Sequence, residues 1–177
     1  RTQGHHAHLV RAARMTGTIR RRLAALPSPA WLAAGACLWG LVMGASAWLK
    51  LELEGWQTEQ SVRSVALIFF AGGLLAYPLA LAAAALVSPR PQSRFSAALI
   101  ALTAFSAGAA ALIYGLQYRI YYSQWHGEPF SVGWMYQTVF TVAAGVYQFL
   151  VLGLRLYFPL GFIALLAASY WFARRSR

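Results

Sequence analysis

A long apolar run at the C-terminal end constrains the fold of this chain more than any other feature. It reaches from Val132 to Phe172 and holds a single charge, Arg155, near its middle. A helix needs about 20 apolar residues to cross the hydrocarbon core of a bilayer, so the run is too long for one crossing. It can form two crossings, or one crossing preceded by a helix that lies on the membrane.

The composition shows that lipid is the solvent for much of the chain. Of the 177 residues, 59% are hydrophobic and only 11% are charged, whereas a soluble domain carries about 25% charged residues. Too little polar surface is left to cover a water-soluble particle. We therefore expect one all-α integral membrane domain, and we claim no resemblance to a known family.

Hydropathy and polar breaks divide the chain into a basic tail (1–29), a membrane domain (30–173) and a basic C-terminus (174–177). We expect four transmembrane helices at about 30–49, 64–87, 95–116 and 156–172. Ser28 and Pro29 are typical of a helix start, with serine as the cap and proline in the first helical position. A histidine-containing tract before Met15 is interpreted as part of a disordered basic tail.

Charge asymmetry orients this arrangement. With four crossings, eleven basic residues lie on the side of the termini, and the other side holds Lys50, Arg63, Arg119 and Arg155. Five crossings would divide the basic residues nine against six. Because Lys and Arg favour the cytoplasmic side, we expect four crossings with both termini in the cytoplasm. The richness in Arg, Ala and Gly suggests a bacterial inner membrane.

Four crossings leave residues 134–154 at the outer face as an interfacial or re-entrant helix. A polar stripe supports this, because Gln137, Thr141, Gln148 and Arg155 follow one another at intervals of 4, 7 and 7 residues and share one face of a helix. Two alternatives stay open, a fifth crossing and one long kinked helix that projects outward. In the preferred arrangement Arg155 reaches the interface and can contact lipid phosphate or a partner subunit.

Small residues form two stripes that allow close approach of helices. One consists of Ala36, Gly40 and Gly44, and a second on the third helix consists of Ala104, Gly108, Ala111 and Gly115. We expect the first and third helices to pack on each other through these stripes. The alternative is that Gly40 and Gly44 face a partner protein.

Arg119, His126 and Glu128 form the dense polar cluster of the chain, in a segment rich in aromatic residues. Pairing of Arg119 with Glu128 would hold this loop, while His126 and Glu128 could perform acid–base chemistry. Outside the N-terminal tail His126 is the only histidine, which excludes bis-histidine haem within one chain. Two candidate ligands are too few for a closed metal site, so we predict no cofactor.

These features favour a non-catalytic accessory or structural subunit of a bacterial inner-membrane complex, in contact with lipids and other membrane subunits. One alternative is a small oligomeric transporter or channel lined by the polar stripe. Another is a lipid- or quinone-handling enzyme with its site at the outer face. Nucleic-acid binding is not expected, because the basic residues cluster at the ends of the membrane segments.

Overall fold

All regular elements of the described chain are helices. The structure is a computed structural model that describes residues 26–55, 62–88 and 91–175. Its long helices are α2 (Pro29–Leu53), α3 (Val62–Val87), α4 (Pro91–Tyr122), α5 (Val132–Gln148) and α6 (Leu160–Arg175). Three short segments join them: η1 (Ser123–Trp125), the π-helical η2 (Phe149–Gly153) and the 3₁₀-helical η3 (Leu154–Tyr157). The all-α prediction is confirmed, and most of the predicted N-terminal tail lies outside the described residues.

Four helices are long and apolar enough to cross a membrane, but they are not the four that the sequence predicts. The first three correspond to the predicted spans, whereas the fourth is the continuous helical run 132–157. The predicted fourth span at 156–172 is shifted, because α6 begins only at Leu160 and has 16 residues. The predicted separate helix at 134–154 is part of the longer run.

The first helix starts where the sequence predicts. Ser28 is the cap residue and Pro29 occupies the first helical position. The Ser28 hydroxyl makes no capping hydrogen bond, whereas its carbonyl accepts from the Leu32 amide at 2.9 Å. The fixed backbone of proline therefore accounts for this start better than side-chain capping does.

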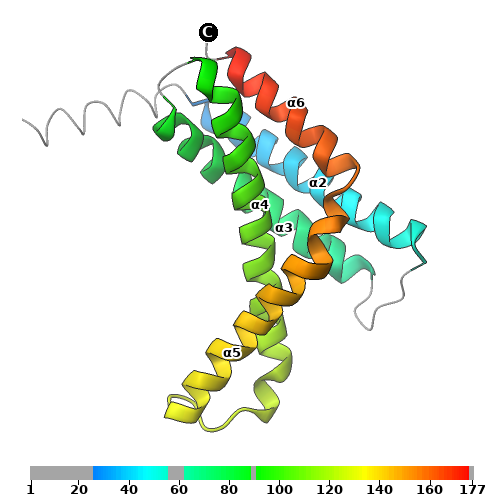
Figure 1. Cartoon of the computed structure of the whole chain (residues 1–177), viewed down its shortest axis with the longest axis vertical. Coiled ribbons are helices and arrows are strands. Elements are labelled where there is room, and N and C mark those ends of the chain that lie inside the picture. The colour runs from blue at the N-terminus through cyan, green and yellow to red at the C-terminus, as the bar shows by residue number, and fades with distance from the viewer. Residues whose placement is uncertain (1–25, 56–61, 89–90, 176–177) are drawn as a thin grey trace, which may run out of the picture.

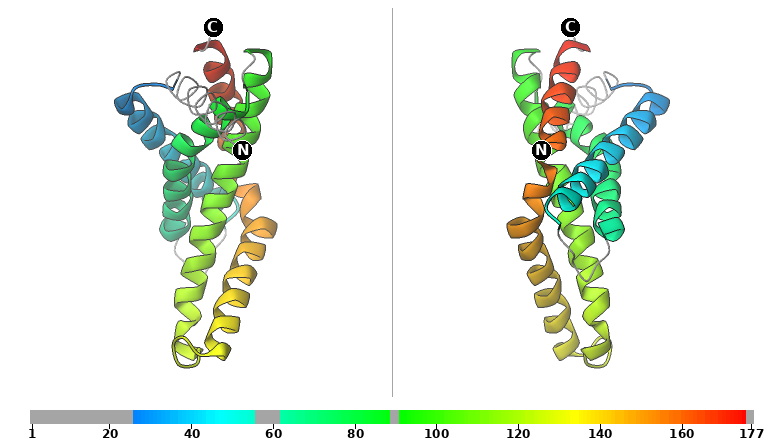
Figure 2. Two further views of the ribbon diagram at one scale, coloured as in Figure 1. Left: turned by 90° about the vertical axis from the view of Figure 1, so that its left-hand side faces the viewer. Right: turned by 90° about the vertical axis from the view of Figure 1, so that its right-hand side faces the viewer.

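After α4 the chain reverses direction, and α5 and then α6 pack along α4. α2 and α3 form an antiparallel pair inclined to α4, and α4 is the longest helix (Figures 1 and 2). α5 packs along the far half of α4, and α6 continues along the half near the start of α4. The beginnings of α2 and α4 and the ends of α3 and α6 lie toward one end of the molecule, and the α4–α5 hairpin extends beyond α2 and α3 at the other.

Glycines set the closest helix contacts, and they correct one prediction. A Cβ on Gly40 would lie 2.7 Å from the Phe70 carbonyl oxygen, and one on Gly44 would lie 3.0 Å from the Ala66 carbonyl oxygen. Gly40 and Gly44 therefore pack on α3, the next helix in the chain, and the expected contact with the third helix is wrong. On α4, Gly115 is in contact with Gly145 of α5, whereas Gly108 has open space beside it.

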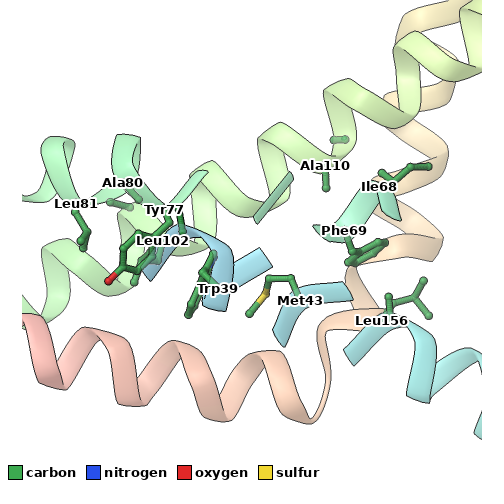
Figure 3. Close-up of a cluster of buried hydrophobic side chains, with 14 of the residues drawn as sticks. Trp39, Met43, Ile68, Phe69, Tyr77, Ala80, Leu81, Leu102, Ala110 and Leu156 are labelled. Carbon is green, nitrogen blue, oxygen red and sulfur yellow. The ribbon is translucent and has the colours of Figure 1, made fainter. Parts of the chain in front are cut away.

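The core lies where α2, α3 and α4 meet the return run. Phe69 of α3 is buried against the rings of Phe149 and Tyr157, with centroids 5.4 and 4.7 Å away. Met43, Leu81 and Leu102 are also fully buried (Figure 3). The core thus joins η2 and η3 firmly to the first three helices, while α5 beyond them packs mainly on α4.

Candidate functional site

The structure divides the predicted polar stripe between two places. Gln137 and Thr141 lie at the tip of the α4–α5 hairpin, whereas Arg155 lies in η3, at the junction with α6. Gln148 is half-buried between them at the end of α5. The four residues therefore take part in separate local contacts within a single chain, and the oligomeric pore stays a prediction.

At the hairpin tip, α5 binds the loop that precedes it. The Gln137 side-chain oxygen accepts from the Gly127 amide at 2.9 Å, and the Thr141 hydroxyl lies 3.2 Å from Nε2 of His126. The Ser131 hydroxyl caps α5 by accepting from the Trp134 amide at 3.1 Å. These bonds explain polar residues on an otherwise apolar helix, because they satisfy the backbone of the turn.

The hydrogen bonds determine which nitrogen of His126 carries a proton. The Thr141 hydroxyl donates to the Gln137 carbonyl oxygen, so its oxygen accepts from Nε2–H of the imidazole. Nδ1 of the same ring is buried and has no hydrogen-bond partner within the described part of the chain. His126 is therefore oriented by α5.

Arg119 and Glu128 do not form the ion pair that the sequence predicts. The Arg119 guanidinium lies over the indole of Trp134, 5.2 Å from the ring centroid. This is a cation–π contact, in which the positive charge is attracted to the face of the ring. Glu128 is exposed, and no hydrogen bond or ion pair joins the side chains of Arg119, His126 and Glu128 to one another in the described residues. The three side chains therefore make separate contacts, and the predicted Arg119–Glu128 pairing is wrong.

A second group of polar contacts stabilises the break, the interruption of the helix at Phe158–Pro159 between η3 and α6. The chain passes from a π-helical turn through a 3₁₀ turn into the cis Phe158–Pro159 bond, so the helical hydrogen bonds are interrupted. The Ser46 hydroxyl of α2 donates to the Leu156 carbonyl oxygen at 3.0 Å and accepts from the Gly161 amide at 3.3 Å. One buried hydroxyl thus satisfies backbone groups on both sides of the break, as an apolar environment requires.

Three charged side chains lie at the same junction. The two carboxylate oxygens of Glu54 contact different cations, Lys50 Nζ at 3.0 Å and Arg155 Nη2 at 3.7 Å. The hydrogen bond from Lys50, with the positive charges of Lys50 and Arg155, lowers the pKa of Glu54 from its ordinary value. Arg155 therefore connects the break to the end of α2.

Comparison with models of protein families, with curated proteins and with solved structures gives no match. In the part of the chain that the structure describes, no group of three or more His, Cys, Asp or Glu side chains is placed to hold a metal ion. A functional proposal therefore depends on the geometry of the hairpin tip, of the η3–α6 junction and of the surfaces around them.

A third set of polar contacts was not predicted from the sequence. Trp39 Nε1 donates to the Ser106 hydroxyl at 3.0 Å, and the Tyr157 hydroxyl donates to the Ser106 carbonyl oxygen at 3.0 Å. Ser106 thus connects α2, α4 and η3. The sequence offered only a weak signal. Ser46 and Ser106 are small polar residues within two apolar spans, where serine commonly bonds across helices, but Ser96 and Thr103 share the span of Ser106 and look the same in the sequence.

Proposed function

We propose that this chain is a non-catalytic subunit of a bacterial inner-membrane complex, and that its α4–α5 hairpin (residues 114–148) binds a partner subunit. The observation that carries the proposal is the exposed apolar surface of the hairpin beyond the end of α2 and α3. The argument depends on where the bilayer ends, on how far α4 reaches beyond it, and on the chemistry of the projecting surface.

Charged side chains lie at two heights along the molecule, and these two levels support a bilayer position between them. The ion-paired Lys50, Glu54 and Arg155 mark one level, and Arg94 and Arg174 mark the other. Charged side chains are costly within the hydrocarbon core and concentrate at its edges. Between the levels, the 16 residues of α6 span about 24 Å, and the inclined α2 and α3 fit a core about 30 Å thick.

The length of α4 supports projection of the hairpin. Its 32 residues span about 48 Å at a rise of about 1.5 Å per residue. Even at a tilt of about 40°, the upper end of the common range, it would cover about 37 Å across a core of about 30 Å. Since Arg94 marks one edge near the start of α4, the excess lies at the other end, in the hairpin.

The hairpin surface is unusually apolar for a segment outside the bilayer. Its exposed large side chains are Leu116, Ile120, Tyr121, Tyr122, Trp125, Phe130, Val132, Met135, Tyr136, Val139, Phe140 and Tyr147. Extended apolar patches in contact with water mark protein-binding surfaces, and aromatic residues are enriched in the cores of such interfaces.

Phe130 adds a specific feature to this surface. It is 87% exposed, and its φ of 67° lies in the left-handed region that a bulky residue rarely adopts. Its ring packs at 5.4 Å from that of Trp134. Such strain is tolerated chiefly where function requires it, and a contact with a partner would account for it.

The orientation follows from the distribution of charge. The end of the molecule with Arg94 and Arg174 belongs to the more basic side of the chain, which also includes the N-terminal arginines of the sequence. The positive-inside rule assigns that side to the cytoplasm. The hairpin and its partner would then lie on the periplasmic side.

A pull-down from native membranes tests the proposal. The tagged chain is extracted in a mild detergent, and co-purifying proteins are quantified for the wild type and for the double variant Tyr136→Ala/Phe140→Ala. These side chains are 64% and 69% exposed one turn apart. We expect at least a tenfold loss of a stoichiometric partner, because interface aromatics often contribute more than about 2 kcal/mol each.

The matched control is Leu75→Ala/Leu79→Ala, an equally spaced exposed pair on α3, which should retain the partner. Recovery of the wild-type chain from mild detergent as a partner-free monomer would contradict the proposal, as would equal loss of the partner in both double variants.

A further inference from the structure

The space enclosed by α2, α4, the break and the start of α6 is a cavity that the proposed function does not use. It has a volume of about 220 Å³, and its lining includes Trp39, Met43, Leu102, Tyr157 and Phe162. The floor is deeply buried, since Met43 is 2% and Leu102 0% exposed. Trp39 and Met43 extend from α2 toward α6 (Figure 3).

The cavity opens through an apolar rim. Leu154, Phe158 and Phe162, which line it, are 43%, 59% and 51% exposed. Leu154 lies in η3 just before the break, Phe158 lies at the break, and Phe162 is in the first turn of α6. Phe158 and Phe162 thus follow Arg155 along the chain toward Arg174. An object that enters from the surrounding lipid can therefore reach Met43 and Leu102 without leaving an apolar environment.

The polar groups in the lining already have partners inside the protein. Trp39 Nε1 bonds to the Ser106 hydroxyl, the Tyr157 hydroxyl to the Ser106 carbonyl oxygen, and the Thr103 hydroxyl to the Leu99 carbonyl oxygen at 2.8 Å. They leave little to recognise a polar ligand or to hold ordered water, which needs two to four polar partners. A quinone ring, which requires donors for its carbonyl oxygens, is poorly suited to this lining.

The volume also limits the occupant. Sites for complete small ligands enclose about 300–1,000 Å³, and this cavity is smaller. An apolar cavity of about 150 Å³ is sufficient to bind benzene, so 220 Å³ accommodates part of a hydrocarbon chain. Leaving it empty would forfeit the dispersion contacts of its walls.

From these observations we infer that the cavity binds a segment of a phospholipid acyl chain, drawn from the adjacent leaflet between α4 and α6. The location favours a phospholipid because the cavity begins beside the break, next to the charged level at which headgroups would lie. The first methylene groups of a chain anchored at that level lie at the depth of Leu154 and Phe158.

Photo-crosslinking tests the inference. The full chain is reconstituted in phosphatidylcholine vesicles that contain a lipid with a diazirine on one acyl chain, irradiated, and mapped by mass spectrometry. We expect the label on Met43 or Leu102 themselves, located within each peptide by fragmentation, because these residues are too buried to be reached by lipid on the outer surface of the helices. Labelling confined to exposed side chains such as Leu38 and Leu41 would overturn the inference.

Two substitutions on α4 separate the cavity from the general lipid surface. Ala107→Trp fills the lining and should reduce labelling of Met43 at least tenfold, whereas Ala104→Trp, exposed on the same helix and outside the lining, should not. Thr103→Trp, which narrows the rim, provides a second test if Ala107→Trp prevents folding. Equal effects of Ala104→Trp and the cavity variants would overturn the inference.

Competition identifies the source of the chain. Unlabelled phosphatidylcholine should reduce the labelling of Met43 only in proportion to its share of total lipid. An isoprenoid quinone that abolishes labelling at a few mole per cent would show that an isoprenoid, and not a phospholipid acyl chain, occupies the cavity, which would overturn the assignment.

Discussion

Ser46 illustrates how a single side chain makes an irregular backbone possible in an apolar helix bundle. It is 1% exposed, and its hydroxyl bonds to a carbonyl before the break and to an amide after it. An apolar residue at this position would leave both backbone groups unsatisfied in a medium that offers no water. The sequence Ala45-Ser46-Ala47 shows only small residues, and nothing in it reveals partners more than a hundred residues away.

Replacing Ser46 with Ala should destabilise the molecule. The two freed backbone groups would cost about 1–3 kcal/mol of unfolding free energy, which corresponds to a Tm lower by several degrees for a chain of this size. Thermal unfolding in a mild detergent measures the change. Ser96→Ala, at an exposed position on α4, is the control, and equal Tm values for the two variants would refute the role of Ser46.

At the scale of elements, the end of α2 and the break form an electrostatic junction. Glu54 bridges Lys50 of its own helix and Arg155 of η3. Because the pKa of Glu54 is lowered in the folded chain, its contribution to the junction is fully present above the ordinary value of 4.5 and is lost as the pH falls through the lowered pKa.

Glu54→Gln should therefore loosen the junction at neutral pH and lose its effect in acid. The amide of Phe158, which bonds to the Arg155 carbonyl oxygen at 3.1 Å, is expected to exchange its hydrogen faster in the variant than in the wild type at pH 6. The difference, after correction for intrinsic exchange, should shrink as the pH falls below 4.5 and through the lowered pKa of Glu54. Glu52→Gln is the matched control, and a pH-independent difference would count against the assignment.

Helix identities were largely predictable at this scale, but two boundaries were not. Apolar runs of sufficient length identify α2, α3 and most of α4. Residues 117–122 were expected to form a loop because they are polar and aromatic, yet they remain helical where α5 packs against Gly115 and Tyr118. The break at Phe158 was placed too early because the backbone on its two sides is bonded by Ser46, which is distant in sequence.

The candidate site was predictable in composition and only partly in geometry. The sequence identified Arg155, His126, Gln137 and Thr141 as polar residues in an apolar setting, and the structure gives each a hydrogen bond or an ion pair. Helical periodicity placed Gln137, Thr141 and Arg155 in one stripe and left His126 outside it. It could not show that one end of the stripe would bond to the turn at the hairpin tip and the other end to Glu54 at the end of α2.

At the scale of the whole molecule, the proposed bilayer position makes the middle of α5 accessible to water. Val139→Cys, in a Cys37→Ala background, should react within minutes with a membrane-impermeant maleimide when the purified chain is reconstituted in vesicles. Val139 is 65% exposed. Leu41→Cys, 60% exposed in the middle of α2, should remain unlabelled, and equally slow labelling at both positions would place the hairpin in lipid.

The Ser46 contacts also impose an order on biosynthesis. Its hydroxyl emerges with the first helix, but the backbone atoms that it bonds, in Leu156 and Gly161, lie 110 and 115 residues later. At a synthesis rate of about 5–20 residues per second, the ribosome needs several seconds to deliver them. The first three helices are synthesised before the segment that packs beside α4, so the two bonds of Ser46 can form only once the final run of the chain has been made.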